Sequence, residues 1–424
     1  MNQLTSGSQL ASAIEELTPE SLQYARNIAF ENSTFLAQRV NGFCNDLRAG
    51  YGGLDTNAIS VVTPGFDSGL GRSLGSLLAY DDPAFHSSAP NGVNYYPGGQ
   101  SGTPSSSSSS TPAPATWDSS NQVISDSPNP YLATTNPGGP ETPKMSEFIG
   151  GDVVLANLNQ NQSTSNSPSS KASYTAGDAT AGVSFRVTNH FAAGVLFDYN
   201  HTDAKTDSSG SKTDVNSYSP GIFATYFDHG FYANGLFSFG YNTYSNTRNI
   251  GFLGETASSN PDGQQYVGDL DVGYDFHPDK SWVVGPTLGL TYTHLNIDSF
   301  TETGAPDANL EVGSQSADSL RSRLGGHLVY QTNTGDVLLQ PNITAMWQHE
   351  YLDNGSGITS SFSDFSADPF TIQTASPSRD SALIGIGLTA TLSNSMALYL
   401  NYLADVGAQD YWAQSVIGGF KARF

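Results

Sequence analysis

Hydrophobic and polar positions alternate, with some irregularity, along the last thirteen residues of the chain, 412–424. On an extended strand, one face would carry Val416, Gly418, Phe420, Ala422 and Phe424, and the opposite face would carry Lys421 and Arg423. A transmembrane β-barrel requires strands of about ten residues with an apolar outer face and a polar inner face, because lipid covers one face and water the other. A soluble β-sandwich could contain one such strand, so the fold class depends on whether the pattern repeats.

The pattern does repeat, and the chain from Met145 onward predicts twelve strands. The candidate strands are 148–160, 172–187, 191–201, 217–227, 231–242, 264–276, 282–297, 319–331, 336–351, 379–392, 396–404 and 412–424. Connections of three or four residues alternate with longer connections, which we expect to be loops; the longest are 204–215, 248–263, 299–317 and 352–378. Short turns alternating with long loops are typical of outer-membrane barrels, whereas a sandwich or propeller has no reason to alternate in this way. We therefore predict an all-β fold, a 12-stranded antiparallel transmembrane β-barrel.

Charged residues in several predicted strands share one face. The acids Asp269 and Asp271 alternate with apolar residues, and Arg321 and Arg323 do the same on another strand. A cation at the bilayer midplane costs roughly 2–4 kcal/mol when it faces lipid, so these side chains should face the lumen. We predict a lumen charge network that braces the barrel and contacts a helix, made of Asp269, Asp271, Arg321, Arg323, Glu350 and Arg379.

A helix is predicted near the start of the chain. Thr18 is a good N-cap, Pro19 suits the first helical position, and Gly50 can end the helix after Arg48. About thirty residues give a length of roughly 45 Å, enough to cross a bilayer inside a pore. The polar positions include Arg39, Asn41 and Asn45, which suit a wet lumen better than lipid. The alternative is a helix packed on a soluble sheet.

The segment between this helix and the first strand, 51–143, is rich in Pro, Ser, Gly and Asn and includes six consecutive serines at 105–110. Such a composition cannot bury enough apolar surface to fold alone, so we expect it to be disordered.

Composition and charge exclude several classes. The chain carries 16 Lys and Arg against 39 Asp and Glu, a net charge of −23, which argues against nucleic acid as a partner. Charged residues make up only 13% of the chain, below the roughly 25% typical of soluble domains. The single Cys44 excludes an internal disulfide, and no apolar run reaches the eighteen residues of a transmembrane helix. Because the first residues do not resemble a signal peptide, we expect an exported form to have sequence upstream.

Two motifs suggest chemistry only weakly. Residues 71–75 match the G-x-S-x-G nucleophile elbow around Ser73, but the strand that should precede this motif is missing. Asp269, Asp271 and Asp275 lack the glycine and the closing glutamate of a calcium loop. We expect no catalytic residue, no metal and no cofactor.

Several segments resemble the C-terminal translocator domain of autotransporters, the type V secretion proteins of Gram-negative bacteria. The resemblance covers the opening helix, 17–40, and most of residues 145–424. Its most specific pieces are Ser319–Leu328 (SLRSRLGGHL), Met346–Tyr351 (MWQHEY), Arg379–Leu388 (RDSALIGIGL) and the terminal GGFKARF. They look like the last five strands of the family in order. The insert between the helix and the first strand is longer than that connection usually is.

The resemblance implies a barrel in the bacterial outer membrane, with the helix threaded through its lumen and tethering an N-terminal passenger that is carried to the cell surface. It implies outer-membrane lipid, the barrel assembly machinery, periplasmic chaperones and the chain's own passenger as partners, with Phe424 and Phe420 as the assembly signal. The barrel is expected to be a monomer. Some relatives cut their passenger at an asparagine in the lumen helix; Asn32, Asn41 and Asn45 are available, but no asparagine pair matches that motif well.

We accordingly divide the chain into the end of a passenger or linker (1–17), a lumen helix (18–50), a low-complexity insert (51–143) and an outer-membrane barrel (144–424). Two other functions stay open at this point. One is a stand-alone channel or porin in which the helix is a plug. The other is a secreted β-rich enzyme that uses Ser73.

Overall fold

The computed structural model describes residue 13 and residues 16–49, 145–159, 171–207, 209–353, 355, 357–374, 378–393, 395–408 and 411–423. The Ser73 motif, the insert 51–143, Gly50 and Phe424 lie outside the described residues.

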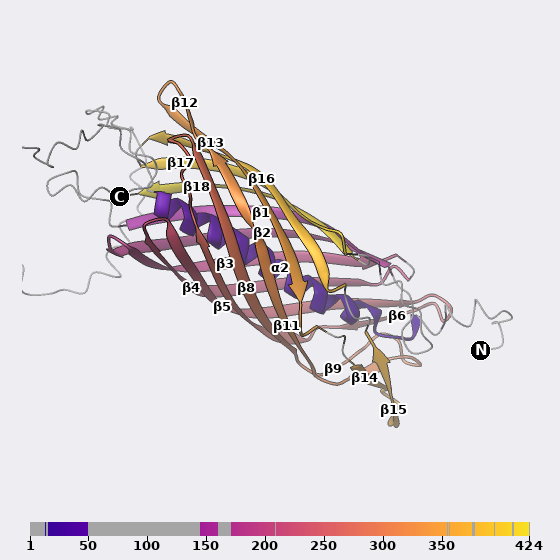
Figure 1. Cartoon of the computed structure of the whole chain (residues 1–424). Coiled ribbons are helices and arrows are strands. Elements are labelled where there is room, and N and C mark those ends of the chain that lie inside the picture. Colours follow the sequence, from indigo (N-terminus) through magenta and orange to yellow (C-terminus); the bar gives the residue numbers. More distant parts are fainter. Residues whose placement is uncertain are drawn as a thin grey trace, which may run out of the picture. The chain divides into compact units, whose positions relative to one another are not determined.

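Twelve long antiparallel strands in the described part of the chain form a closed barrel (Figure 1). They are β1 (Met145–Asn159), β2 (Lys171–Thr188), β3 (Phe191–Thr206), β4 (Lys212–Asp228), β5 (Phe231–Ile250), β7 (Asp262–Tyr274), β8 (Trp282–Ile297), β11 (Gln315–Tyr330), β13 (Val337–Glu350), β16 (Asp380–Ser393), β17 (Met396–Val406) and β18 (Tyr411–Arg423). Each strand pairs with its neighbours in sequence, and β18 returns to pair with β1, with Val416 opposite Val153. Closure leaves the barrel without a free sheet edge. The predicted fold class is therefore confirmed.

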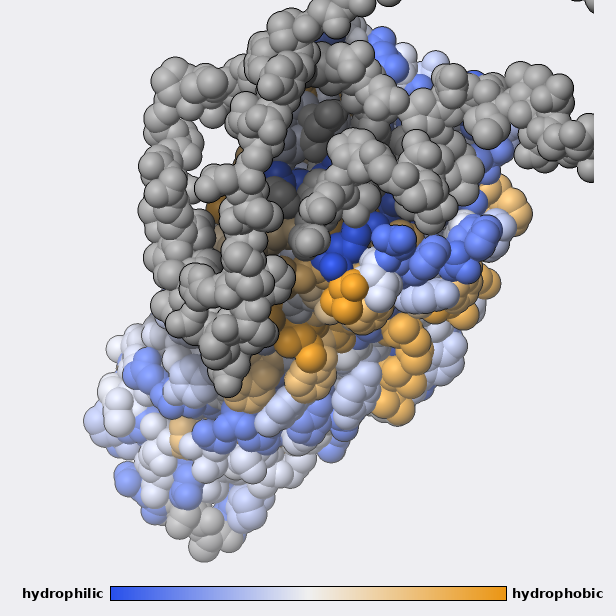
Figure 2. Space-filling model, turned by 90° about the vertical axis from the view of Figure 1, so that its left-hand side faces the viewer, coloured by the Kyte–Doolittle hydropathy of each residue, from blue (hydrophilic) through white to orange (hydrophobic). Residues whose placement is uncertain are grey.

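The alternating pattern explains which side chains face outwards. On β7, Leu270 is 50% exposed whereas the neighbouring Asp269 and Asp271 are buried. On β16, Ile384 and Ile386 are exposed in the same way. In Figure 2 hydrophobic side chains gather on the flank of the barrel, and the more distant end is mostly hydrophilic. Among the described residues, no helix has the length and apolar character to cross a membrane.

The two ends of the barrel differ. At one end, called here the turn end, the connections are short, as between β2 and β3 or between β4 and β5. At the other, called the loop end, the strands extend beyond their predicted bounds: β3 continues to Thr206, β5 continues to Ile250 and β11 begins at Gln315.

Several of the long connections at that end contain short strands, which the sequence pattern did not predict. These are β6 (Glu255–Ser259), β9 (Phe300–Thr301), β10 (Leu310–Val312), β14 (Gly357–Phe362) and β15 (Phe365–Gln373); β12 (Thr332–Thr334) extends a hairpin at the turn end. Four of them form a separate sheet, called here the side sheet, in the order β15-β14-β10-β9. Leu310, Val312 and Ile358 are fully buried together, so the side sheet has an apolar core of its own.

The helix α2 (Glu20–Ala49) lies inside the barrel (Figure 1). It packs most closely against β3, β4, β5 and β8. Phe43 shows how the contact is made: its ring centroid lies 4.1 Å from that of Phe148 on β1 and 5.5 Å from that of Phe223 on β4. Because aromatic rings bury a large apolar area, this contact anchors the C-terminal half of the helix.

Two glycines lie where the first and last strands of the barrel pair. A Cβ atom at Gly419 on β18 or at Gly150 on β1 would overlap the hydroxyl group of Tyr399 on β17. The Tyr399 side chain therefore lies across the β1–β18 seam, in space that only glycine leaves free.

Candidate functional site

The lumen-facing contacts between α2 and the barrel form the candidate functional site. Its first part is the Arg39 cluster, made of Arg39, Asp152, Asp178 and Asp198. Arg39 Nη1 lies 2.5 Å from Asp152 on β1, and Nη2 lies 2.7 Å from Asp178 on β2 and 3.1 Å from Asp198 on β3. All four side chains are almost fully buried. A planar guanidinium with five donors can satisfy several carboxylates at once, which a lysine ammonium could not do with the same geometry.

The second part is the Arg323 cluster. Arg323 on β11 is fully buried, and its Nη2 lies 2.7 Å from Asp269 and 2.8 Å from Asp271, both on β7. The helix joins this cluster through Asn41, whose amide donates to Asp269 at 3.0 Å and also to Asp271. Thr291 on β8 donates to Asp269 at 2.6 Å. The two acids are therefore held by one barrel cation and by the helix.

The third part, the Arg321 cluster, lies nearer the loop end. Arg321 pairs with Glu31 of the helix at 2.5 Å and with Glu350 of β13 at 2.9 Å. Next to it, Arg26 of the helix pairs with Asp353 at 3.3 Å and donates to Thr374 at 2.8 Å. Burial raises the pKa of Asp353, while the positive charge of Arg26 acts in the opposite direction.

The last turn of the helix is held at the turn end. Arg48 pairs with Asp275 at 3.2 Å and stacks 3.5 Å above the centre of the Tyr232 ring. Arg186 donates to the carbonyl of Leu47 at 2.8 Å, which satisfies one of the last carbonyl groups of the helix. Lys421 of β18 contacts Asp46.

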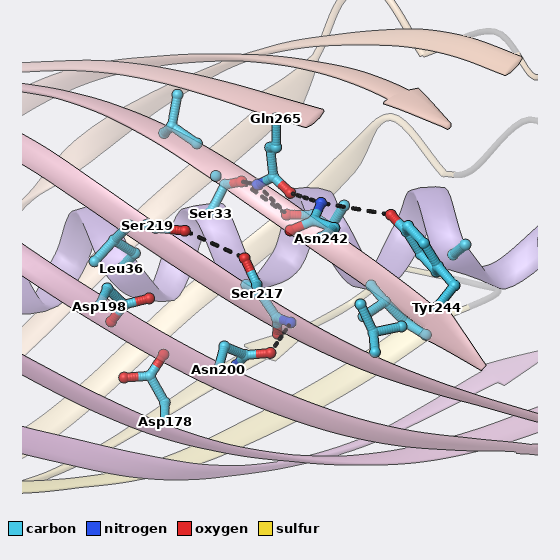
Figure 3. Close-up of a pocket in the computed structure, with 17 residues that line it drawn as sticks. Ser33, Leu36, Asp178, Asp198, Asn200, Ser217, Ser219, Asn242, Tyr244 and Gln265 are labelled. Atoms are coloured by element: carbon cyan, nitrogen blue, oxygen red, sulfur yellow. Dashed lines mark hydrogen bonds between the residues drawn. The ribbon is translucent and has the colours of Figure 1, made fainter. Parts of the chain in front are cut away.

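Neutral polar groups fill the space between these charged clusters. Figure 3 shows Ser33 of the helix facing Gln265 of β7, and Gln265 Nε2 donates to Ser33 Oγ at 2.7 Å. Asn242 continues the chain of hydrogen bonds to Gln265 at 3.3 Å and to Tyr244 at 3.4 Å. The remaining cavity on this side of the helix is only about 30 Å³. The helix therefore fills this part of the lumen.

The structure places most of the predicted site residues in these clusters. Asp269, Asp271 and Arg323 lie together with Asn41, and Arg321 lies with Glu350. Five predicted residues remain, and one of them, Phe424, lies outside the described residues. Arg39 binds acids of other strands, Asn45 accepts from Arg48, and Phe420 lies opposite Ile149. Arg379 is exposed just before β16 and donates to the carbonyls of Glu350 and Tyr351. The roles assigned to these residues remain predictions.

The sequence did not identify the acids that surround Arg39, nor the charged residues of the helix and of a loop that pair near the loop end. The missed residues are Asp152, Asp178, Asp198, Glu31, Arg26 and Asp353. The first three occupy lumen-facing positions in the first three strands, so strand parity could have identified them. Glu31 and Arg26 lie on the helix, and nothing in the linear sequence indicates which barrel residue they meet.

An antiparallel barrel with an apolar exterior, a charged lumen and short connections at one end is an outer-membrane β-barrel. The chain belongs to the autotransporter β-domain family: the family model described as "Autotransporter beta-domain" matches residues 154–403, which is 250 of its 424 residues. It is a translocator domain of the bacterial outer membrane, and such a domain is not itself a catalyst. Family membership does not favour the porin or the secreted enzyme.

Curated relatives and a solved structure agree with this assignment. Outer membrane protein B of Rickettsia japonica is 27% identical over 221 residues, which covers 50% of this chain and 13% of that protein. Outer membrane protein A of Rickettsia conorii is 25% identical over 295 residues, covering 66% of this chain and 14% of that protein. The chain thus spans less than a sixth of the length of these relatives. The fold is similar to the translocator domain of the autotransporter NalP from Neisseria meningitidis, with a TM-score of 0.52 and 17% identity, over 66% of this chain and 88% of that one.

Proposed function

We propose that this domain exports a passenger attached ahead of its helix and then anchors it at the cell surface. The observation that carries the proposal is the direction in which α2 is held. The backbone carbonyl of Glu16, just before the helix, accepts a hydrogen bond from Arg248 at the loop end of β5 at 2.9 Å. At the other end the carbonyl of Leu47 accepts from Arg186, near a short turn. Because the long loops of outer-membrane barrels face outwards, polypeptide ahead of the helix emerges on the outer side.

Retention of the helix follows from its buried ion pairs. Arg26, Glu31, Arg39 and Arg48 each bind a barrel or loop residue, so charged contacts are distributed along its whole length. Sliding the helix would leave several buried charges without partners, and an unpaired buried charge costs several kcal/mol. The helix therefore acts as a tether after export.

The proposal also assigns a role to each segment of the chain. Residues 1–17 end the passenger or linker, 18–50 form the tether, 51–143 form an insert and 144–424 form the barrel. The end of α2 and the start of β1 both lie at the turn end of the barrel. Barrel assembly machinery and periplasmic chaperones would recognise the C-terminal strand with Phe420 and Phe424, and the barrel would work as a monomer.

We also propose that the tether is not cut. Asn41 is the asparagine closest to barrel acids, yet its amide donates to both Asp269 and Asp271, and its backbone is in the middle of a helix. Acids in this position could accept a proton from the amide, so the proposal rests on the sequence of the helix, in which no asparagine pair matches the cleavage motif of the family well. Mass spectrometry of the purified outer-membrane protein should give one intact chain.

Export can be tested with an epitope tag placed ahead of Met1 and behind a signal peptide in a Gram-negative host. The tag should bind antibody on intact cells and be removed by added protease. Arg39→Met should reduce the displayed tag per barrel, because three buried carboxylates lose their cation, whereas Lys280→Met in an exposed turn should not. A barrel that is folded in the membrane while its tag stays inaccessible would contradict the proposal.

A further inference from the structure

A second small cavity lies beside α2 near the loop end, away from the face that packs on β3, β4 and β5. It has a volume of about 30 Å³. Its walls include Asn27 and Glu31 from the helix, Gln348 from β13 and Asp405 from β17. Asn27 and Glu31 are four residues apart, so they lie on the same face of the helix. The cavity thus lies between the helix and the barrel wall.

Four oxygen atoms on these walls are buried and have no hydrogen-bond partner among the described residues. They are Asn27 Oδ1, Glu31 Oε2, Gln348 Oε1 and Asp405 Oδ1. Glu31, Gln348 and Asp405 are 4%, 4% and 1% exposed. Buried polar atoms in native proteins are nearly always hydrogen-bonded or bound to an ion or water. Four such acceptors around one cavity therefore indicate a bound group that donates hydrogen bonds, such as water, or a cation.

The other polar atoms of three of these side chains are already engaged, which fixes their orientation. Glu31 Oε1 accepts from Arg321 at 2.5 Å. Gln348 Nε2 donates to Ser381 at 3.3 Å and to Asp405 Oδ2 at 3.1 Å. Turning the Gln348 amide around would lose both of these donated bonds. The amide therefore presents its oxygen, rather than its nitrogen, as the unpartnered atom.

The charges around the cavity also favour a cation. Its walls carry three carboxylates, of Glu31, Glu350 and Asp405, against two guanidiniums, of Arg321 and Arg379. Arg321 is shared by Glu31 and Glu350. Among the described residues, Asp405 makes no direct ion pair, and it shares the positive charge of Arg321 with Glu31 and Glu350. Three buried carboxylates that share one buried cation are strongly unfavourable.

We propose that this cavity binds one Ca²⁺ ion through Glu31, Asp405, Gln348 and Asn27. Carboxylate and amide oxygens are the ligands that Ca²⁺ prefers, and Ca²⁺ accepts irregular geometry completed by water, whereas Mg²⁺ demands a regular octahedron. A volume of about 30 Å³ leaves room for an ion with a water molecule. The ion would join the helix to β13 and β17, strands on the side of the barrel that α2 packs against least closely. This role does not depend on the identity or presence of a passenger.

The test uses the full chain refolded in detergent and freed of metal with a chelator. Ca²⁺ titration followed by calorimetry should give one site, and the unfolding temperature should rise with Ca²⁺ concentration, since a ligand bound only by the folded state stabilises it. Asp405→Asn and Glu31→Gln should each weaken binding by at least about tenfold, as loss of a metal-site contact typically does. Asp336→Asn, at an exposed turn position, should bind like the wild type.

A second measurement guards against variants that fold poorly. Tyr411 lines the cavity, so Tb³⁺ bound there should luminesce when tyrosine is excited. Tyr411→Phe should reduce this luminescence, and Ca²⁺ should displace Tb³⁺. A cavity filled only by water would show no saturable Ca²⁺ binding by the wild type. That result, or equal Ca²⁺ affinity of Asp405→Asn, Glu31→Gln and Asp336→Asn, would overturn the proposal.

Discussion

Arginine is the residue around which the charges of this lumen are organised. Arg39, Arg321 and Arg323 are each nearly or fully buried, and each contacts two or more carboxylates. Burying one charge without a partner would be prohibitive, but a fork of donors meeting several acids keeps every group paired. These contacts specify where the helix sits, because their geometry exists in one position only.

Removing one of these cations should be costly. In Arg323→Met, Asp269 and Asp271 stay buried while losing their positive partner, so we expect the free energy of unfolding to fall by about 3–5 kcal/mol. Arg379→Met should cost clearly less, because Arg379 is exposed and donates to the backbone carbonyls of Glu350 and Tyr351. Denaturant unfolding of the refolded barrels measures both changes. Equal losses in the two variants would show that burial of the ion pairs does not matter.

At the scale of single residues, the alternation along each strand predicted which side chains face the lumen. It did not predict which charged side chains contact one another. The alternation of Asp269 and Asp271 with Leu270, and of Arg321 and Arg323 with Leu324, predicts which of them face the lumen. That Arg323 meets both acids depends on β7 and β11 both flanking β8, where Asp271 and Arg323 lie opposite the same residue, Gly289. Such a relation across three strands is absent from the linear sequence.

At the scale of elements, the long strands and the helix were predictable because their signals are long and repeated. Twelve alternating segments and a capped helical pattern each extend over many residues. In the side sheet, β9 and β10 were missed because they are two and three residues long, too short for a periodic signal. Their strand conformation comes from burial of Leu310 and Val312 against Ile358, which lies in a different loop.

The pairing of β1 with β18, which closes the barrel, can be tested by a substitution at Gly419. In Gly419→Ala the new Cβ would overlap the Tyr399 hydroxyl and would lie 2.6 Å from the carbonyl oxygen of Ile149. The clash with backbone cannot be relieved by a rotamer change, so β1–β18 closure should be weakened and the barrel should refold more slowly. Gly268→Ala on β7 is the matched control, because no atom lies within 4 Å of the position that its new methyl group would take.

Refolding is followed by the shift in gel migration between unheated and heated samples. We expect Gly268→Ala to refold like the wild type and Gly419→Ala to lag behind it. If the two variants refold alike, the glycine requirement at the seam is refuted.

At the scale of the whole molecule, the fold and the family lead to the same arrangement. The barrel provides an apolar exterior for lipid, and the helix occupies the lumen with its start at the loop end. Arg248 donates to the backbone carbonyl of Glu16, just before the helix begins. Its guanidinium also pairs at 2.5 Å with Glu302, which lies between β9 and β10 of the side sheet. The direction of the helix could not be predicted from its own sequence, since it depends on which barrel end its first residues meet.

The central claim is that the helix fills the pore of the folded barrel, and single-channel conductance in a planar lipid bilayer tests it most directly. The intact chain should conduct poorly, because α2 lies inside the barrel and contacts several of its strands, leaving a cavity of about 200 Å³ beside the C-terminal part of the helix. A variant lacking residues 18–50 should form the same barrel and conduct several-fold more. An intact chain that conducts as freely as the deletion variant would contradict the account.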